Sequence, residues 1–178
     1  MTKTNPYNVK QIKKVAEGIR SSYNIPSDTF FPIYDYIMEL VDKDCLEYQI
    51  LEDNDKFFDE GEYAKYNGID NTIYVKDSVD AELTGEDIIG YRSNFTLAHE
   101  LFHFMQVQVL KFDFSKVDEK VEAFCDPEWQ ANEFAGQLLL PEKYLDLEVD
   151  DLVEKFHVSK ECALYRKVKY KKRTKKNG

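Results

Sequence analysis

The segment Thr96–His103 places two histidines, His99 and His103, four residues apart, and Glu100 follows the first directly. Apolar residues surround this H-E-x-x-H pattern at helical spacing, which predicts a helix from Phe95 to about Val109. Residues i and i+4 lie on one face of a helix, so both imidazoles can bind one metal ion. The chain has only three histidines, and two of them form this pair. The pattern therefore predicts a metal-binding helix inside the core.

The residue types suit hydrolysis of an amide bond at a zinc ion. Zinc activates a water molecule, and a carboxylate beside the first ligand can accept its proton, which makes Glu100 the candidate general base. A catalytic zinc also needs a third protein ligand and one open coordination position. Glu128 is the best candidate because it begins a second apolar helix 25 residues after His103. The alternatives that spacing alone allows are Glu119, Glu122 and Cys125.

The composition indicates a folded protein rather than a disordered one. Of the 178 residues, 43% are apolar and 14% aromatic, which is enough for one compact domain with a core. Three widely spaced cysteines fit a reducing compartment and argue against a disulfide framework. The N-terminus lacks the apolar stretch of a signal peptide, and no run is long enough to span a membrane. We therefore expect a cytoplasmic protein without membrane contact.

The pattern of apolar residues predicts helices on both sides of a small sheet. Helices are expected at 7–23 and 30–41, a strand at 46–50 and a hairpin whose strands, 64–66 and 69–75, flank Asn67-Gly68. Residues 76–93 are polar and contain two glycines, which indicates mainly a connecting loop. Asp126 as N-cap and Pro127 as first residue begin the second strong helix, which Pro141 ends. A helical pair at 150–170 completes an α+β fold.

Two blocks of sequence together resemble the ImmA/IrrE family of metallopeptidases. The first is Arg92-x-x-Phe-Thr-Leu-Ala-His99-Glu100-Leu-x-His103, and the second is Glu128-x-x-Ala-Asn132-x-Phe-Ala-x-x-Leu-Leu-x-Pro141. The resemblance implies that His99, His103 and Glu128 bind Zn²⁺ and that Glu100 is catalytic. It also implies a zincin-like minimal metalloprotease core with a small sheet and an active-site helix. One departure is Phe102, which stands where the family usually has glycine and could narrow the substrate's access.

Family members cut transcriptional repressors of the helix-turn-helix class that control mobile elements or stress genes. The resemblance therefore implies a protein substrate of this class. In such a fold an edge strand before the active helix aligns the extended substrate, and residues 69–75, with Ile69, Ile73, Tyr74 and Val75, are the expected strand. Asn132 is expected to orient the site or tie the two helices together, and Arg92 to anchor the start of the active helix. Tyr74 and Tyr91 are the tyrosines nearest the motif that could stabilise an oxyanion.

The C-terminal part differs in charge from the rest of the chain. Its last 20 residues carry seven lysines, two arginines and one glutamate, a charge of +8, so the preceding part carries −18. We expect three units: a metallopeptidase domain at 1–141, a helix-turn-helix-like helical appendage at 142–170, and a basic flexible tail at 171–178. Arg166, Lys167 and Lys169 could contact DNA, although packing of the appendage on the body is favoured. His157 is expected to be a turn or core residue.

Two other functions remain open at this point. The protein could be a non-catalytic anti-repressor module that keeps the zinc fold and only grips its partner, but pure binding would not require Glu100. It could instead bind DNA through its basic C-terminus, a reading that the acidic body and a pI near 4.8 disfavour. The sequence does not indicate the oligomeric state, the scissile bond or an activation signal.

Overall fold

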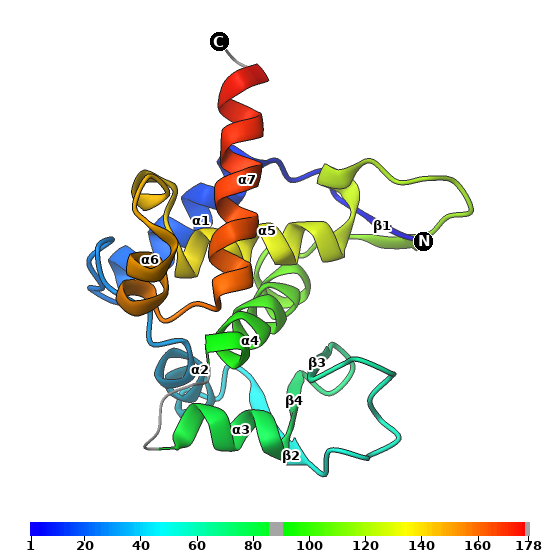
Figure 1. Cartoon of the computed structure of the whole chain (residues 1–178). Helices are drawn as coiled ribbons and strands as arrows, with labels where there is room; N and C mark the ends of the chain where they lie inside the picture. The colour runs from blue at the N-terminus through cyan, green and yellow to red at the C-terminus, as the bar shows by residue number, and fades with distance from the viewer. Residues whose placement is uncertain (86–90, 177–178) are drawn as a thin grey trace.

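Two helices that cross at the centre of the molecule organise the fold. The computed structural model describes residues 1–85 and 91–176, and in it α4 (Tyr91–Phe104) runs between the sheet on one side and α5 (Pro127–Leu139) on the other (Figure 1). Leu97, Ala98 and Leu101 of α4 are fully buried, as the apolar pattern predicted. Helix α1 (Val9–Ser22) packs beside α5. The α+β class predicted from the sequence is confirmed.

Local capping explains where these helices begin. Asn8 accepts from the backbone N–H groups of Lys10 and Gln11, and the Gln11 side chain accepts from the Asn8 N–H, which is a reciprocal capping box. The start of α5 is as predicted, with the Asp126 carboxylate accepting from the Glu128 N–H and proline at the first helical position. This cap fixes the position of Glu128 in the first turn of α5.

The sheet has three strands in the order β2-β4-β3. Strand β2 (Glu47–Leu51) runs parallel to β4 (Thr72–Lys76), and β3 (Ala64–Asn67) pairs antiparallel with the other side of β4. The prediction that residues 69–75 form an edge strand open to the substrate was therefore wrong. Ile73, Tyr74 and Val75 lie in the central strand, whose two edges are both occupied, and Ile69 lies outside the strands with its side chain 97% exposed.

The hairpin between β3 and β4 forms, but its turn differs from the predicted one. Asn67 is the last residue of β3, and residues 68–71 connect the strands. Asn71, with φ of 57°, is the only residue of this turn in the left-handed region. The turn is therefore longer than the expected two-residue Asn67-Gly68 turn, and the positive φ falls at its far end.

The remaining elements surround this centre. Further elements are α2 (Ile33–Asp42), α3 (Asp77–Thr84), the π-helix Met105–Val109, and the antiparallel ribbon of β1 (Thr2–Thr4) and β5 (Phe114–Lys116). Helix α3 occupies part of a segment predicted to be loop, and the π-helix extends α4 over residues predicted to continue the regular helix. Residues 86–90 of the expected loop lie outside the described residues.

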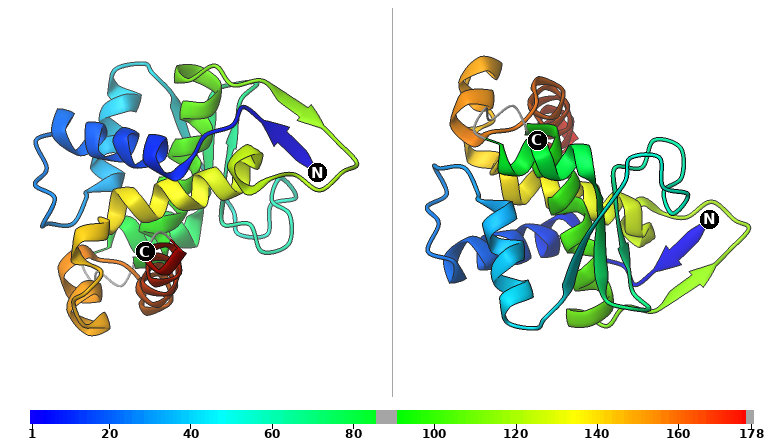
Figure 2. Two further views of the ribbon diagram at one scale, coloured as in Figure 1. Left: turned by 90° about the horizontal axis from the view of Figure 1, so that it is seen from above. Right: turned by 90° about the horizontal axis from the view of Figure 1, so that it is seen from below.

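The predicted C-terminal helical pair is present as α6 (Val149–Phe156) and α7 (Lys160–Lys176). It lies at one end of the molecule and the β1–β5 ribbon at the other (Figure 2). His157 joins the two helices with φ of 52° and stacks on the rings of Phe30 and Tyr91. The structure assigns helix to residues 171–176, where the sequence predicted a flexible tail, while Asn177 and Gly178 lie outside the described residues.

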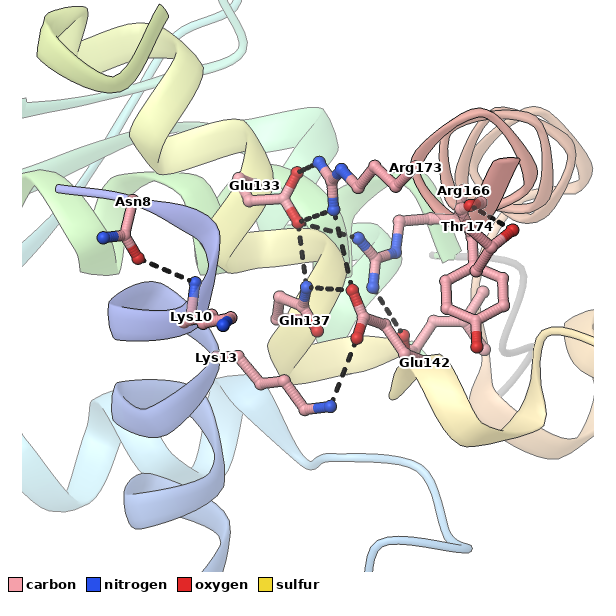
Figure 3. Close-up of polar contacts among 11 residues, drawn as sticks. Asn8, Lys10, Lys13, Glu133, Gln137, Glu142, Arg166, Arg173 and Thr174 are labelled. Carbon is pink, nitrogen blue, oxygen red and sulfur yellow. Dashed lines mark hydrogen bonds and ion pairs between the residues drawn. The ribbon is translucent and has the colours of Figure 1, made fainter. Parts of the chain in front are cut away.

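A buried carboxylate anchors α7 to α5. Glu133, whose side chain is 1% exposed, accepts hydrogen bonds from Arg166, Arg173 and Gln137 (Figure 3). Gly136 makes room for this contact, because a Cβ there would lie 2.7 Å from Cδ of Arg166. Arg166 is thus buried in an ion pair and does not present its charge to DNA.

Across the described residues, no helix combines the length and the apolar run that a membrane span needs.

Candidate metal centre

The side chains of His99, His103 and Glu128 converge between α4 and α5. The Nε2 atoms of the two histidines are 3.0 Å apart, and the Glu128 carboxylate lies 3.2 Å from His99 Nε2 and 3.3 Å from His103 Nε2. Ligand atoms held 2.0–2.1 Å from a tetrahedral ion are separated by about 3.3 Å. All three candidate ligand atoms lie within 4.8 Å of one another. The donor set and its spacing therefore fit a metal with two imidazole ligands and one carboxylate.

Among the described residues, the structure assembles only one such group near the motif, and it contains Glu128. Glu119, Glu122 and Cys125, which spacing alone allowed, do not belong to it and line a separate hollow with Lys3 and Lys120. Glu128 stands in the first turn of α5, where the helix dipole also favours a negative charge. The two imidazoles hold the pKa of Glu128 far below its usual range, so the carboxylate is ionised at neutral pH.

The second ring nitrogen of each histidine has its own partner. His99 Nδ1 lies 3.2 Å from Oδ1 of Asn132, which is exposed, and an orienting role for Asn132 stays a prediction. His103 Nδ1 lies 2.9 Å from Oε1 of Gln106, a fully buried residue of the π-helix. Sequence reasoning missed Gln106, although a glutamine within an apolar run one turn after a ligand is a recognisable signal. Arg92, the other expected supporting residue, is exposed and lies over the ring of Tyr63, away from the ligands.

Glu100 is buried beside the three ligands and faces the sheet. Its Oε2 accepts a hydrogen bond of 2.7 Å from the backbone N–H of Tyr66 in β3. Burial raises the pKa of Glu100 above the usual carboxyl value, although the two histidines and the Tyr66 N–H act in the opposite direction. A carboxylate with a raised pKa is a stronger base, which is the property that proton abstraction from water requires.

Burial and the neighbouring carboxylates act on the pKa of His103 in opposite directions. Burial lowers the pKa of its imidazole, but the carboxylates of Glu128 and Glu100 outweigh burial and leave the pKa above its usual value. The local charge therefore favours a cation at this position. A divalent metal ion placed between the three candidate ligand atoms would be stabilised by the same carboxylates in place of the proton on His103.

The three candidate ligands stand on the wall of an open cleft of about 500 Å³. The cleft extends along β3, which contributes Ala64, Lys65 and Tyr66, and a second hollow bordered by the β1–β5 ribbon shares His103, Phe114 and Glu128 with it. The two hollows give room for an elongated ligand on both sides of the metal centre. Tyr74 and Tyr91, the tyrosines nearest the motif in sequence, do not line the cleft, whereas Tyr63 and Tyr66 do.

The expectation that Phe102 narrows the cleft was wrong. Its side chain is fully buried and stacks on Phe134 of α5, with ring centroids 4.7 Å apart. A residue in this position faces α5 rather than the cleft, so its bulk contributes to the packing of the two helices. Substrate access beside His103 is unaffected.

Comparison with known families agrees with the sequence resemblance. The family described as the IrrE N-terminal-like domain, a peptidase family, matches residues 90–167, a segment that includes His99, Glu100, His103 and Glu128. No curated protein sequence matches the chain. The match also extends across residue 141, where the sequence suggested a domain boundary, and that division of the chain remains a prediction.

Proposed function

We propose that the protein, whose residues 90–167 match the IrrE N-terminal-like domain of a peptidase family, is a zinc-dependent endopeptidase. The observation that carries the proposal is the convergence of two imidazole nitrogens and one carboxylate at 3.0–3.3 Å beside a buried glutamate. Two nitrogen ligands, one carboxylate ligand and a fourth open position are typical of catalytic zinc. When bound, zinc polarises the scissile carbonyl and the attacking water.

The protein's own residues divide the remaining work. His99, His103 and Glu128 hold the ion, and Glu100 takes the proton of the attacking water and passes it to the leaving amine. The backbone N–H of Tyr66 holds one oxygen of Glu100, which leaves the other oxygen for the proton transfer. The raised pKa of Glu100 serves both directions of this transfer.

The edge of β3 that does not pair with β4 is the surface on which we expect an extended substrate to lie. Tyr63 O accepts from Lys76 N, so alternate residues of β3, namely Ala64 and Tyr66, turn their backbone groups away from β4. That edge borders the cleft. The Tyr66 N–H on this edge is already bonded to Glu100, so a substrate strand would add through the Ala64 N–H and the outward carbonyl groups, a role that the central strand β4 cannot take. Ala64→Pro removes one outward N–H, and we expect a raised KM for peptide cleavage with unchanged zinc content.

The proposed substrate is a transcriptional repressor of the helix-turn-helix class. This proposal rests on the family resemblance. The test is to incubate the zinc-loaded protein with the helix-turn-helix repressor encoded beside its gene and to follow cleavage by mass spectrometry. Wild type should cut the repressor and Glu100→Gln should not, with both variants binding zinc equally. The same cleavage by both variants, or a wild-type protein that takes up no zinc, would contradict the proposal, and repressor binding without cleavage would favour an anti-repressor module.

A further inference from the structure

The ring of His103 is connected to two backbone carbonyl groups through a chain of two buried glutamines. Gln106 Oε1 lies 2.9 Å from His103 Nδ1, and Gln106 Nε2 donates to Gln130 Oε1 at 2.8 Å. Gln130 Nε2 in turn donates to the carbonyl oxygens of Asn5, at 2.9 Å, and Phe124, at 2.8 Å. Both glutamine side chains are 0% exposed. The chain therefore runs from the candidate metal ligand to main-chain atoms without passing through solvent.

The two carbonyl groups determine the direction of every hydrogen bond in this chain. A carbonyl oxygen only accepts, so Gln130 must turn its NH₂ group toward Asn5 and Phe124 and its Oε1 toward Gln106. Gln106 must then direct its own NH₂ toward Gln130, and the carbonyl oxygen of Pro127, 3.4 Å from Gln106 Nε2, favours the same orientation. Gln106 Oε1 is left facing His103. It accepts, so the proton of His103 is held on Nδ1 and the lone pair on Nε2 points toward the metal centre.

The main-chain groups at the far end of the chain are themselves held in place. The side chain of Asn5 accepts from the Asp113 N–H at 2.6 Å, and Phe124 O also accepts from the Tyr7 N–H at 2.7 Å. The segment before α1 and the segment before α5 are thus joined at this point. The π-helix supplies the other end, because Gln106 lies in its first turn, three residues after His103.

We propose that Gln106 is a positioning residue that holds His103 as a metal ligand through Nε2, with its own orientation set by Gln130 and the carbonyls of Asn5 and Phe124. The inference rests on the proposed zinc site and does not require proteolysis. Partners of the second ring nitrogen of a ligating histidine fix its tautomer and its ring orientation. Burial alone requires the amide groups of Gln106 to have partners, but it does not require one of those partners to be the ring of a candidate metal ligand.

The first measurement compares zinc affinities, by competition with a chelator, for wild type, Gln106→Leu, Gln130→Leu and Gln108→Leu. We expect Gln106→Leu and Gln130→Leu to bind zinc about 10- to 100-fold more weakly, the range found when such partners are removed. Gln108→Leu is the matched control, because Gln108 lies in the same π-helix but its side chain bonds to the Tyr66 hydroxyl and not to a histidine. It should bind zinc like wild type. Circular dichroism identifies variants that fold.

The second measurement begins with the wild-type protein. In the zinc-loaded wild-type protein labelled with ¹⁵N histidine, the ring Nδ1–H of His103 should give a proton signal that is protected from exchange with water. In a folded Gln106→Leu variant that signal should broaden or disappear. A merely structural role of Gln106 would not alter it.

The outcomes separate this inference from the proposed function. A folded Gln106→Leu protein that binds zinc like wild type, or a wild-type protein without a protected Nδ1–H at His103, overturns the positioning role alone. A wild-type protein that binds no zinc overturns the metal centre itself. A protein that binds zinc but cuts no peptide leaves the positioning role in place and contradicts only the proteolysis.

Discussion

Helix α5 carries two glutamates, and they stand in opposite environments. The side chain of Glu128 is 65% exposed and faces His99 and His103, whereas that of Glu133 is 1% exposed and faces Arg166 and Arg173. Burial acts to raise the pKa of Glu133, but the two guanidinium groups outweigh it and leave the pKa below the usual carboxyl value. The pKa of Glu128 is also lowered, in its case by the two imidazoles. A lowered carboxyl pKa therefore does not by itself distinguish a candidate metal ligand from a structural anchor.

What distinguishes them is the number of partners that remain to be satisfied. The oxygens of Glu133 accept from two arginines and from Gln137, all within the protein (Figure 3). Glu128 faces two imidazoles that each have another partner on the far nitrogen, and it stands at an open cleft. The Glu133 side of α5 is thus closed and holds α7, whereas Glu128 in the first turn faces an open cleft. The two sites should respond differently to mutation.

Removal of the Glu133 carboxylate should have the largest effect on stability. Glu133→Ala leaves Arg166 buried without its counter-charge, and breaking a buried ion pair from one side costs about 3–5 kcal/mol. We expect the free energy of unfolding, measured by urea titration, to fall by that amount, and α7 to lose its protection from hydrogen exchange first. Zinc affinity of the folded fraction should be unchanged. A loss of less than about 1 kcal/mol would show that α7 does not depend on this carboxylate.

Glu128→Gln should show the reverse pattern. The amide keeps the size of the side chain but removes the charged ligand, so zinc affinity should fall by more than about 100-fold, beyond the cost of losing an outer partner. Stability without metal should change by less than about 1 kcal/mol, since the side chain is exposed. Chelator competition and urea titration on the same samples test both parts. Retention of wild-type zinc affinity would exclude Glu128 as a ligand.

Acidification should reduce the difference between wild type and Glu133→Gln. Because the folded pKa of Glu133 lies below its unfolded value of about 4.3, its ion pairs stabilise the protein fully above that pH and lose their contribution as the pH falls through the folded pKa. Protonated glutamate resembles glutamine, so the gap in Tm between the two proteins should be largest near pH 7 and narrow below about pH 4. A gap that stays constant down to pH 3 would contradict this role.

The sequence predicted the parts of the site that depend on local spacing. His99 and His103 share a helix face because they are four residues apart, and the Asp126-Pro127 start fixed where Glu128 would stand. Each feature can be recognised from the sequence of a single helix, α4 for the histidine pair and α5 for Glu128. Helix α3 was missed because its polar residues and nearby glycine resemble a loop in composition.

Features that depend on distant pairing could not be predicted in this way. Strand β4 is central because β2, more than 20 residues earlier in the sequence, pairs with its other edge, and no pattern inside β4 reports that. The two arginine partners of Glu133 follow it by 33 and 40 residues. The position of Gln106 in an apolar run could have marked it as unusual, but its partners His103 and Gln130 became known only from the structure.

The smallest expected effect concerns Asn132, which follows Ala131 and precedes Glu133 on α5 but lies on the exposed side. Its Oδ1 is 3.2 Å from His99 Nδ1, and water can replace it there, so Asn132→Ala should weaken zinc binding by only about 10-fold, the lower end of the range for such partners. Gln106→Leu, whose site is closed to water, should cost more. Chelator competition on both variants decides the order. If Asn132→Ala weakened zinc binding more than Gln106→Leu, burial would not govern how firmly each histidine is held, and the contrast between the open and the closed sides of α5 would not extend to the ligands.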